Sequence, residues 1–171
     1  MMKRAILLLM LLVLVAGQAS AQIGGMLNKS QSSGKGDPRV SSLFDQTGVK
    51  YEVDGDGDFK VINELDDGRT QLVFIISKTN MVGHLEIREV WSVGYMPDGE
   101  MSKDALELLL YANDRMKLGF WRLVDFGENV AGVLCAQIAA DIDARSMLQV
   151  IQTISDTADT MEEMLMEGDN L

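Results

Sequence analysis

The chain has 171 residues, of which 47% are hydrophobic, with 15 Lys and Arg against 26 Asp and Glu, one His and one Cys. This length suits one domain with its own core. A formal net charge of −11 without any basic run argues against a nucleic-acid scaffold, because phosphate backbones are bound by clustered Lys and Arg. A single Cys cannot form an internal disulfide, so stability has to come from packing.

Residues 1–21 have the three parts of a secretory signal peptide. Two basic residues precede an apolar run over residues 5–16, and small residues lead up to Ala21. The run is shorter than the about 20 apolar residues of a membrane-spanning helix, which favours cleavage over a retained anchor. We therefore expect a periplasmic or secreted protein that begins at Gln22 and has no membrane segment after cleavage.

The rest of the chain divides into three parts. Residues 22–36 are rich in Gly, Ser, Asn and Gln, which predicts a flexible lead-in. Residues 37–167 carry the patterns of helices and strands and form the expected single domain. Residues 168–171 are expected to be a disordered tail.

The domain is predicted to begin with a short helix and a hairpin. Asp37 and Pro38 provide a helix start, and Gly48 stands just past its end. Two strands, at residues 51–53 and 59–65, flank a tract of alternating Gly and Asp that suits a turn.

Two further strands are expected before the next helix. Residues 72–76 are apolar on both faces, which predicts a strand that is covered on both sides. Residues 82–95 alternate, so that one face is mostly apolar and the other polar. The apolar face carries Leu85, Ile87, Trp91, Val93 and Tyr95, and the polar face carries His84, Glu86, Arg88 and Ser92. We expect the polar face to be exposed.

The second half adds two helices and two strands. Ser102 can cap a helix that continues to Gly119, strands are expected at 120–126 and 130–139, and a long amphipathic helix follows Asp143. The predicted class is α+β, an antiparallel sheet with three helices in the order α-β-β-β-β-α-β-β-α.

Several consecutive segments resemble the YbjN family. They are residues 51–59, 67–74, 85–92 and 116–121, and the likeness extends over most of residues 38–168. The resemblance implies a fold like that of type III secretion chaperones, and the family is described as sensory transduction regulators. It supplies no catalytic residue. The predicted export signal does not fit a regulatory role in the cytoplasm.

Asp54, Asp56 and Asp58 have the spacing of the first ligands of a calcium loop. Phe59 stands where that loop needs Gly, and Leu65 where it needs a bidentate Glu. The flanks are predicted strands, whereas such a loop joins helices. We interpret the tract as a hairpin turn, with weak binding of a divalent cation as the alternative.

No catalytic constellation is visible. His84 and Cys135 are the one pair that could provide a base and a nucleophile, but His84 is on a polar face and Cys135 alternates with apolar residues as in a core. We expect no enzyme activity and no cofactor. A hydrolase with an unrecognised site stays the alternative.

The expected function is protein binding, as an exported chaperone-like or regulatory module whose partner the sequence does not identify. The candidate contact residues are Glu86, Arg88 and Trp91, although core packing is the more common role of such a Trp. Methionines on the terminal helix could line an adaptable groove or fill a core. That helix has an apolar stripe wide enough for a second copy, so a homodimer is also expected.

The cleavage site is directly testable. We expect the protein recovered from the exported fraction to begin at Gln22, because small residues precede the predicted cut. Intact-mass measurement of that protein checks this, and a mass that includes Met1 contradicts it.

Overall fold

A computed structural model describes residues 34–65 and 68–168. The predicted signal peptide, its predicted cleavage site at Ala21 and Gln22, most of the predicted lead-in and residues 169–171 lie outside these ranges. The helices are α2 (Pro38–Thr47), α3 (Lys103–Ala112) and α4 (Ala144–Gly168), and α3 continues into a 3₁₀ turn, η2 (Asn113–Arg115). The strands are β1 (Glu52–Val53), β2 (Phe59–Glu64), β3 (Thr70–Ile75), β4 (Asn80–Val82), β5 (Leu85–Tyr95), β6 (Phe120–Asp125) and β7 (Val130–Ala139).

The strands form one antiparallel sheet in the order β1-β2-β3-β5-β7-β6, with β4 beside the start of β5. This confirms the predicted α+β class and element order. The short strand β4 was not predicted. Gly83 takes a left-handed conformation (φ 61°) and turns the chain within the region that the sequence suggested was one continuous strand. The β1–β2 hairpin around the Gly-Asp tract is confirmed.

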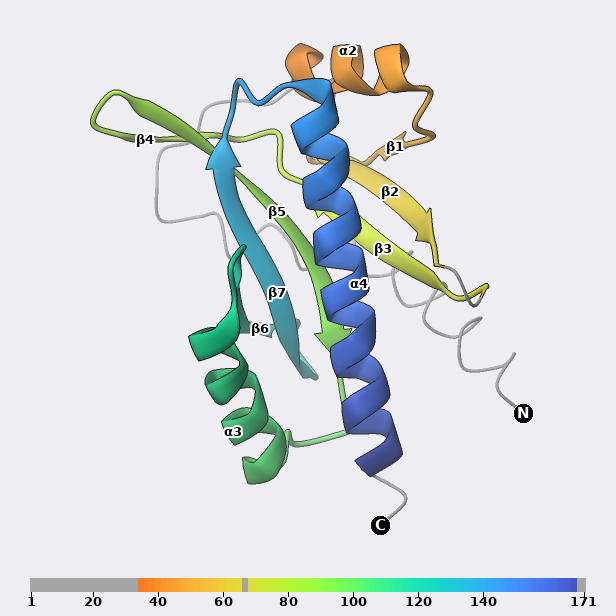
Figure 1. The fold of residues 1–171 in the computed structure, drawn as a ribbon, viewed down its shortest axis with the longest axis vertical. Helices are drawn as coiled ribbons and strands as arrows, with labels where there is room; N and C mark the ends of the chain where they lie inside the picture. Colours follow the sequence, from red (N-terminus) through yellow and green to blue (C-terminus); the bar gives the residue numbers. More distant parts are fainter. Residues whose placement is uncertain (1–33, 66–67, 169–171) are drawn as a thin grey trace.

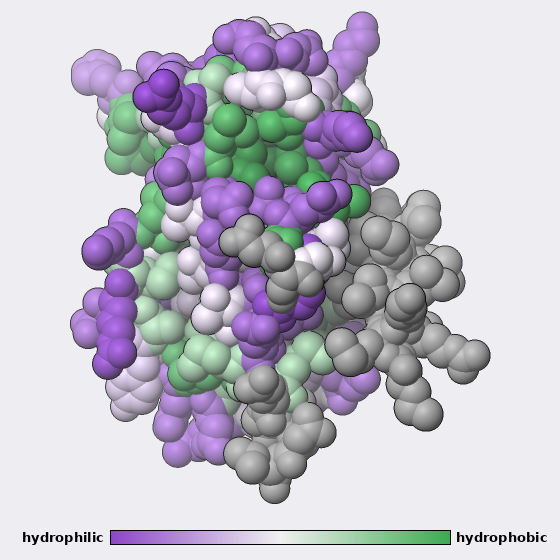
Figure 2. Space-filling view, turned by 45° about the vertical axis from the view of Figure 1, so that its right-hand side comes forward, coloured by the Kyte–Doolittle hydropathy of each residue, from purple (hydrophilic) through white to green (hydrophobic). Residues whose placement is uncertain are grey.

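All three helices lie on the same face of the sheet (Figure 1). The core fills the space between them and includes Phe44 of α2, Leu109 of α3 and Ile154 of α4. A view turned by 45° shows a surface of mixed hydropathy, with an apolar area just below α2 (Figure 2). The molecule therefore has two layers, and the opposite face of the sheet carries none of the described helices.

The end of α3 differs from the expected helix up to Gly119. The α-helix stops at Ala112, and Asn113 begins η2. The Asn113 side chain accepts a hydrogen bond from the backbone N–H of Trp121 (2.6 Å) and donates one to its carbonyl (3.3 Å). These two bonds tie the end of the helix to β6, which is a contact that helical periodicity cannot show.

The central strand β5 presents to the helices the face that the sequence suggested was exposed. Arg88 and Ser92 are fully buried beneath the helical layer, together with Val90. The expectation that Arg88 belongs to an exposed face is wrong. Arg88 is accommodated there because Asp37 gives it a buried ionic partner. Further along the strand α4 comes so close that a Cβ on Gly94 would lie 3.1 Å from the carbonyl oxygen of Ala158.

The expectation that residues 72–76 are covered on both sides is also wrong. Val73 and Ile75 are buried beneath the helices, whereas Leu72 and Phe74 are half-buried on the other face. In the described part of the chain, no helix covers that face (Figure 1).

A buried ion pair joins α2 to β5. Arg88 donates to a carboxylate oxygen of Asp37 and to the carbonyl oxygens of Ile76 and Ser77. Asp37 is also the N-cap of α2, accepting from the backbone N–H of Arg39 at 2.9 Å. Hydrogen bonds from both arginines hold the Asp37 pKa well below its usual range, although burial acts in the opposite direction.

Because Asp37 both caps α2 and pairs with the buried Arg88, its removal should destabilise the protein more than the loss of a helix cap alone. Asp37→Ala should lower the free energy of unfolding by about 3–5 kcal/mol, because it leaves the buried Arg88 guanidinium without an anionic partner. Asp143→Ala is the matched control, since Asp143 caps α4 through Ser146 but holds no buried cation, and it should cost about 1 kcal/mol. Urea unfolding of both variants measures the difference, and equal losses would show that the ion pair contributes nothing beyond the cap.

Candidate functional site

The side chains that point away from the helices form a continuous surface, here called the open face. Directly paired residues of five neighbouring strands build its central row. From one side to the other this row consists of Lys60, Phe74, Trp91, Cys135 and Phe120. The sheet therefore brings together aromatic residues from β3, β5 and β6 that are far apart in the sequence.

A stacked aromatic pair marks the middle of the open face. The rings of Phe74 and Trp91 are nearly parallel, at 12°, with their centroids 4.1 Å apart. The ammonium of Lys60 lies 5.7 Å from the centre of the Phe74 ring, within the range of a cation–π interaction. Phe74 and Trp91 both stay half-exposed, so this pair offers a rigid apolar surface to a partner.

An ion pair crosses the open face next to the aromatic pair. Arg122 of β6 donates to Glu89 of β5 at 3.0 and 3.3 Å, and Gln137 donates to the same carboxylate at 3.3 Å. Because β7 lies between β5 and β6, the Arg122 side chain passes over that strand. It helps to bury Cys135, whose thiol pKa is raised to about 12 by burial and by the Glu89 charge.

A second row adds apolar surface. Ile62 pairs with Leu72 of β3 and Val93 pairs with Val133 of β7; Ile62 is 54% exposed, whereas Val133 is fully buried. The open face carries little net charge, because Lys60 and Arg122 oppose Glu52, Glu64 and Glu89, in contrast to the net −11 of the chain. Exposed apolar areas of this kind are typical of interaction sites.

The three predicted contact residues do not form one site. Trp91 lies on the open face, but Arg88 is enclosed on the helical side. Glu86 accepts hydrogen bonds from Arg39 (2.8 Å) and from Thr79 (2.6 Å), so it joins β5 to α2, and these bonds lower its pKa to about 2. Of the three, the structure leaves Trp91 available to a partner, while Glu86 and Arg88 hold the fold together.

The carboxylates of the Gly-Asp tract build the turn. One oxygen of Asp54 accepts from the backbone N–H groups of Asp56 and Asp58, both at 3.0 Å, and the other lies 3.5 Å from the Lys60 ammonium. Asp58 instead accepts from the N–H of Ser77 at 2.7 Å. Within the described residues there is no cluster of three or more potential metal ligands, so the structure does not supply converging ligands for the weak cation site.

The candidate base and nucleophile are far apart. His84 is in the turn before β5, whereas Cys135 pairs with Trp91, seven residues further along, which corresponds to about 20 Å along a strand. Cys135 is buried, as predicted, but it lies on the open-face side of β7 and not in the core beneath the helices. These two residues cannot act together in this fold.

Four important residues of the open face were not predicted from the sequence: Lys60, Phe74, Glu89 and Arg122. Their alternation within each strand was visible, but their meeting depends on the register between strands that are not neighbours in the sequence. Arg122 and Glu89 are 33 residues apart, for example. The apolar face of β5 was a sequence feature that could have indicated the open face, although such a face more often packs in a core.

Comparisons with models of protein families, with curated proteins and with solved structures found no match. What is shown is an α+β fold with an antiparallel sheet and three helices. Across the described ranges, no helix combines the length and the hydropathy that crossing a bilayer would require.

Asp58 makes the stability of this region depend on pH. Burial and the charges of Asp54 and Asp56 raise its pKa to about 6, although the Ser77 N–H opposes this. A raised carboxyl pKa gives stability that is complete below the unfolded value of 3.8 and is lost as the pH rises through about 6. Asp58→Asn, which mimics the protonated form, should therefore raise the melting temperature at pH 7.5 and change it little at pH 4.5.

Asp45→Asn is the control, because it removes the same charge from an exposed position on α2. Thermal unfolding of the three proteins at both pH values separates the local effect from the change in net charge. A gain at pH 7.5 that is no larger for Asp58→Asn than for the control would contradict the assignment.

Proposed function

We propose that the protein is an exported, non-enzymatic binding module, chaperone-like or regulatory in role, whose open face binds a partner protein. The observation that carries this proposal is the stacked Phe74–Trp91 pair, half-exposed on a sheet face that none of the described helices covers. Aromatic and arginine side chains dominate binding energy at many protein interfaces. The open face has Trp91 at its centre and Arg122 beside it.

The balance of charges supports a protein partner. An acidic chain is repelled by other acidic surfaces, and this repulsion weakens where the contact surface itself is neutral. The open face has three acids and two bases, so a partner surface would meet little excess charge. The hydrolase alternative finds less support, because His84 and Cys135 are separated and the open face has no enclosed group of titratable side chains.

Membership of the YbjN family, and with it a role in sensory transduction, is the finer part of this proposal. It rests on the four resembling segments and on the α+β fold. One of these segments, residues 85–92, contains Trp91, and another, residues 67–74, contains Phe74. The proposed contact surface thus lies within the part of the chain that carries the resemblance.

A second copy of the chain is one partner that the open face suits. Five strands at a spacing of about 4.8 Å, over about 20 Å of their length, give roughly 500 Å² of flat surface. Two such surfaces together bury about 1,000 Å², which is at the lower end for specific interfaces. The predicted homodimer would then use the open face, and α4 would stay in the helical layer of each copy.

Charged substitutions on the open face test the proposal. Ile62→Glu adds a charge at a well-exposed apolar position of β2 and should leave folding intact. We expect it to reduce at least tenfold the amount of any protein that the wild-type mature chain captures from the exported fraction. Trp91→Ala, which removes one ring of the stack, should have the same effect.

Leu110→Glu is the matched control, because Leu110 is an exposed apolar residue of α3, in the helical layer. It should capture the same proteins as the wild type. Sedimentation of wild type and Ile62→Glu at equal concentrations tests whether the partner is a second copy. Capture and self-association that both survive Ile62→Glu and Trp91→Ala would rule out the open face as the binding surface.

A further inference from the structure

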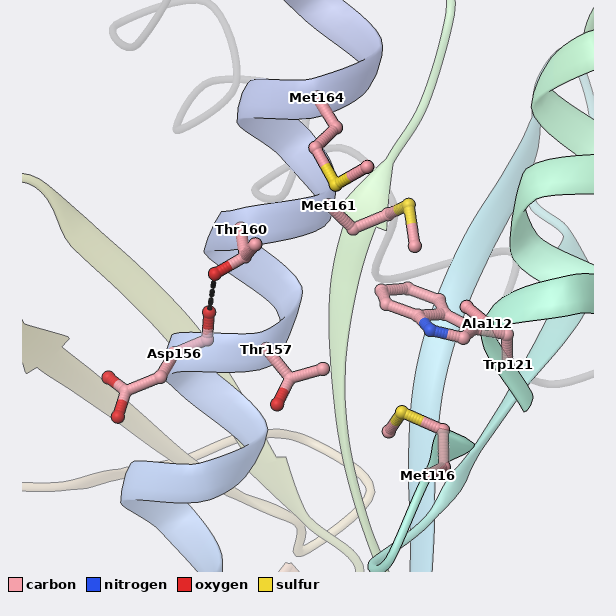
Figure 3. A pocket seen from close by; sticks show the side chains of 8 residues that line it. All are labelled: Ala112, Met116, Trp121, Asp156, Thr157, Thr160, Met161 and Met164. Carbon is pink, nitrogen blue, oxygen red and sulfur yellow. Dashed lines mark hydrogen bonds between the residues drawn. The ribbon is translucent and has the colours of Figure 1, made fainter. Parts of the chain in front are cut away.

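A small groove in the helical layer, on the other side of the sheet from the open face, has the features of a separate binding site. It lies between α4 and the α3–η2 end, with Trp121 of β6 at its base, and its volume is about 260 Å³ (Figure 3). The lining is mainly apolar and rich in methionine. It consists of Ala112, Met116, Trp121, Asp156, Thr157, Thr160, Met161 and Met164.

Trp121 is held firmly in place. Asn113 fixes its backbone through two hydrogen bonds, and its ring lies so close to β5 that a Cβ on Gly94 would be 2.4 Å from the ring carbon Cη2. The side chain is only 6% exposed. A ring held this way presents its edge to the groove in a fixed orientation.

The indole N–H of Trp121 has no hydrogen-bond partner within the described part of the chain. Buried donors are nearly always paired, because an unpaired one loses its bond to water without replacement. Figure 3 shows the nitrogen on the side of the ring that faces Met116. Met116 is half-exposed and its unbranched side chain has several rotamers, so a small displacement would open this donor to a ligand.

The other lining residues and the volume of the groove indicate which class of ligand it can bind. Asp156 is the one ionisable residue of the lining, and its carboxylate accepts from Gln152 at 2.7 Å. That carboxylate points away from Trp121 and the methionines, toward the β2 side of α4 (Figure 3), so it contributes no direct contact to a ligand in the groove. The volume is below the roughly 300–1,000 Å³ of sites for drug-sized molecules, so the groove suits one apolar side chain rather than a whole lipid.

We infer that this groove binds an extended peptide segment, with one apolar side chain, such as Leu or Met, among the methionines and a backbone carbonyl that accepts from the Trp121 indole N–H. A peptide offers this carbonyl next to an apolar side chain, and its neighbouring amide N–H can donate to the hydroxyl of Thr157, which lines the groove. Met161 and Met164 supply the adaptable apolar contact. The site is independent of the open face, since the two lie on opposite sides of the sheet.

The indole N–H gives a direct readout, because the chain has two tryptophans and each gives one indole signal in a ¹H–¹⁵N spectrum. The signal that is missing in Trp121→Phe belongs to Trp121. On addition of N-acetyl-leucine N-methylamide to the mature protein, we expect this signal to move downfield and to saturate with a roughly millimolar Kd, as the size of the probe allows. The Trp91 signal should not move.

Decanoate, added in a parallel titration, tests the competing acyl ligand and should give no saturable shift of the Trp121 signal. Ala112→Leu fills the groove and should abolish the shift caused by the capped leucine, while an unchanged Trp91 signal shows that this variant is folded. Ile62→Glu, which disrupts the open face, should bind the probe as the wild type does. The inference is overturned by the absence of a saturable shift, by tighter binding of decanoate, or by undiminished binding to Ala112→Leu.

Discussion

The close approach of α4 to the central strand β5 is the constraint on which the other features depend. At Gly94 the helix backbone and the Trp121 ring both come within the space that a side chain would occupy. Bulky residues therefore cannot face α4 along this part of β5. They are placed on the other face of the strand, which is why Trp91 and Val93 belong to the open face while Ser92 lies beneath the helix.

This arrangement leaves polar groups in the buried layer, and several of them are paired locally, although Arg88 Nε, Trp121 Nε1 and Ser155 Oγ have no partner in the described part of the chain. Ser92 donates to the Leu72 carbonyl at 2.7 Å, and Gln71 donates to Ser92 and to the Val93 carbonyl. Arg88 is balanced by Asp37 at the start of α2. Such a network specifies one register and one position of α2, because any shift would leave a buried charge or amide unpaired.

The two proposed surfaces follow from the same packing but differ in kind. The open face is broad and carries little net charge, and it suits a protein surface. The groove beside Trp121 is small and mainly apolar, and it suits a single side chain of a peptide. A binding module with both could hold a folded partner and an extended segment at the same time, since neither surface blocks the other.

The sequence by itself determined the class, the element order and most of the element ends, because these depend on local features. Asp37, Pro38 and Gly48 mark the ends of α2 through capping and backbone conformation, and the Gly-Asp tract specifies a turn through its side-chain bonds to the backbone. Periodicity was enough to predict the long α4. Burial of Cys135 was likewise visible from its apolar neighbours.

Only the tertiary structure decided which face of β5 is covered. Alternation shows that Trp91 and Arg88 point in opposite directions, but it does not show which of the two faces lies against the helices. The hydropathy of the two faces favoured the wrong one. The outcome depends on Gly94, Trp121 and Ala158, which meet from three separate elements. The row from Lys60 to Phe120 and the groove beside Trp121 are also products of long-range register and packing, so no local pattern could have predicted them.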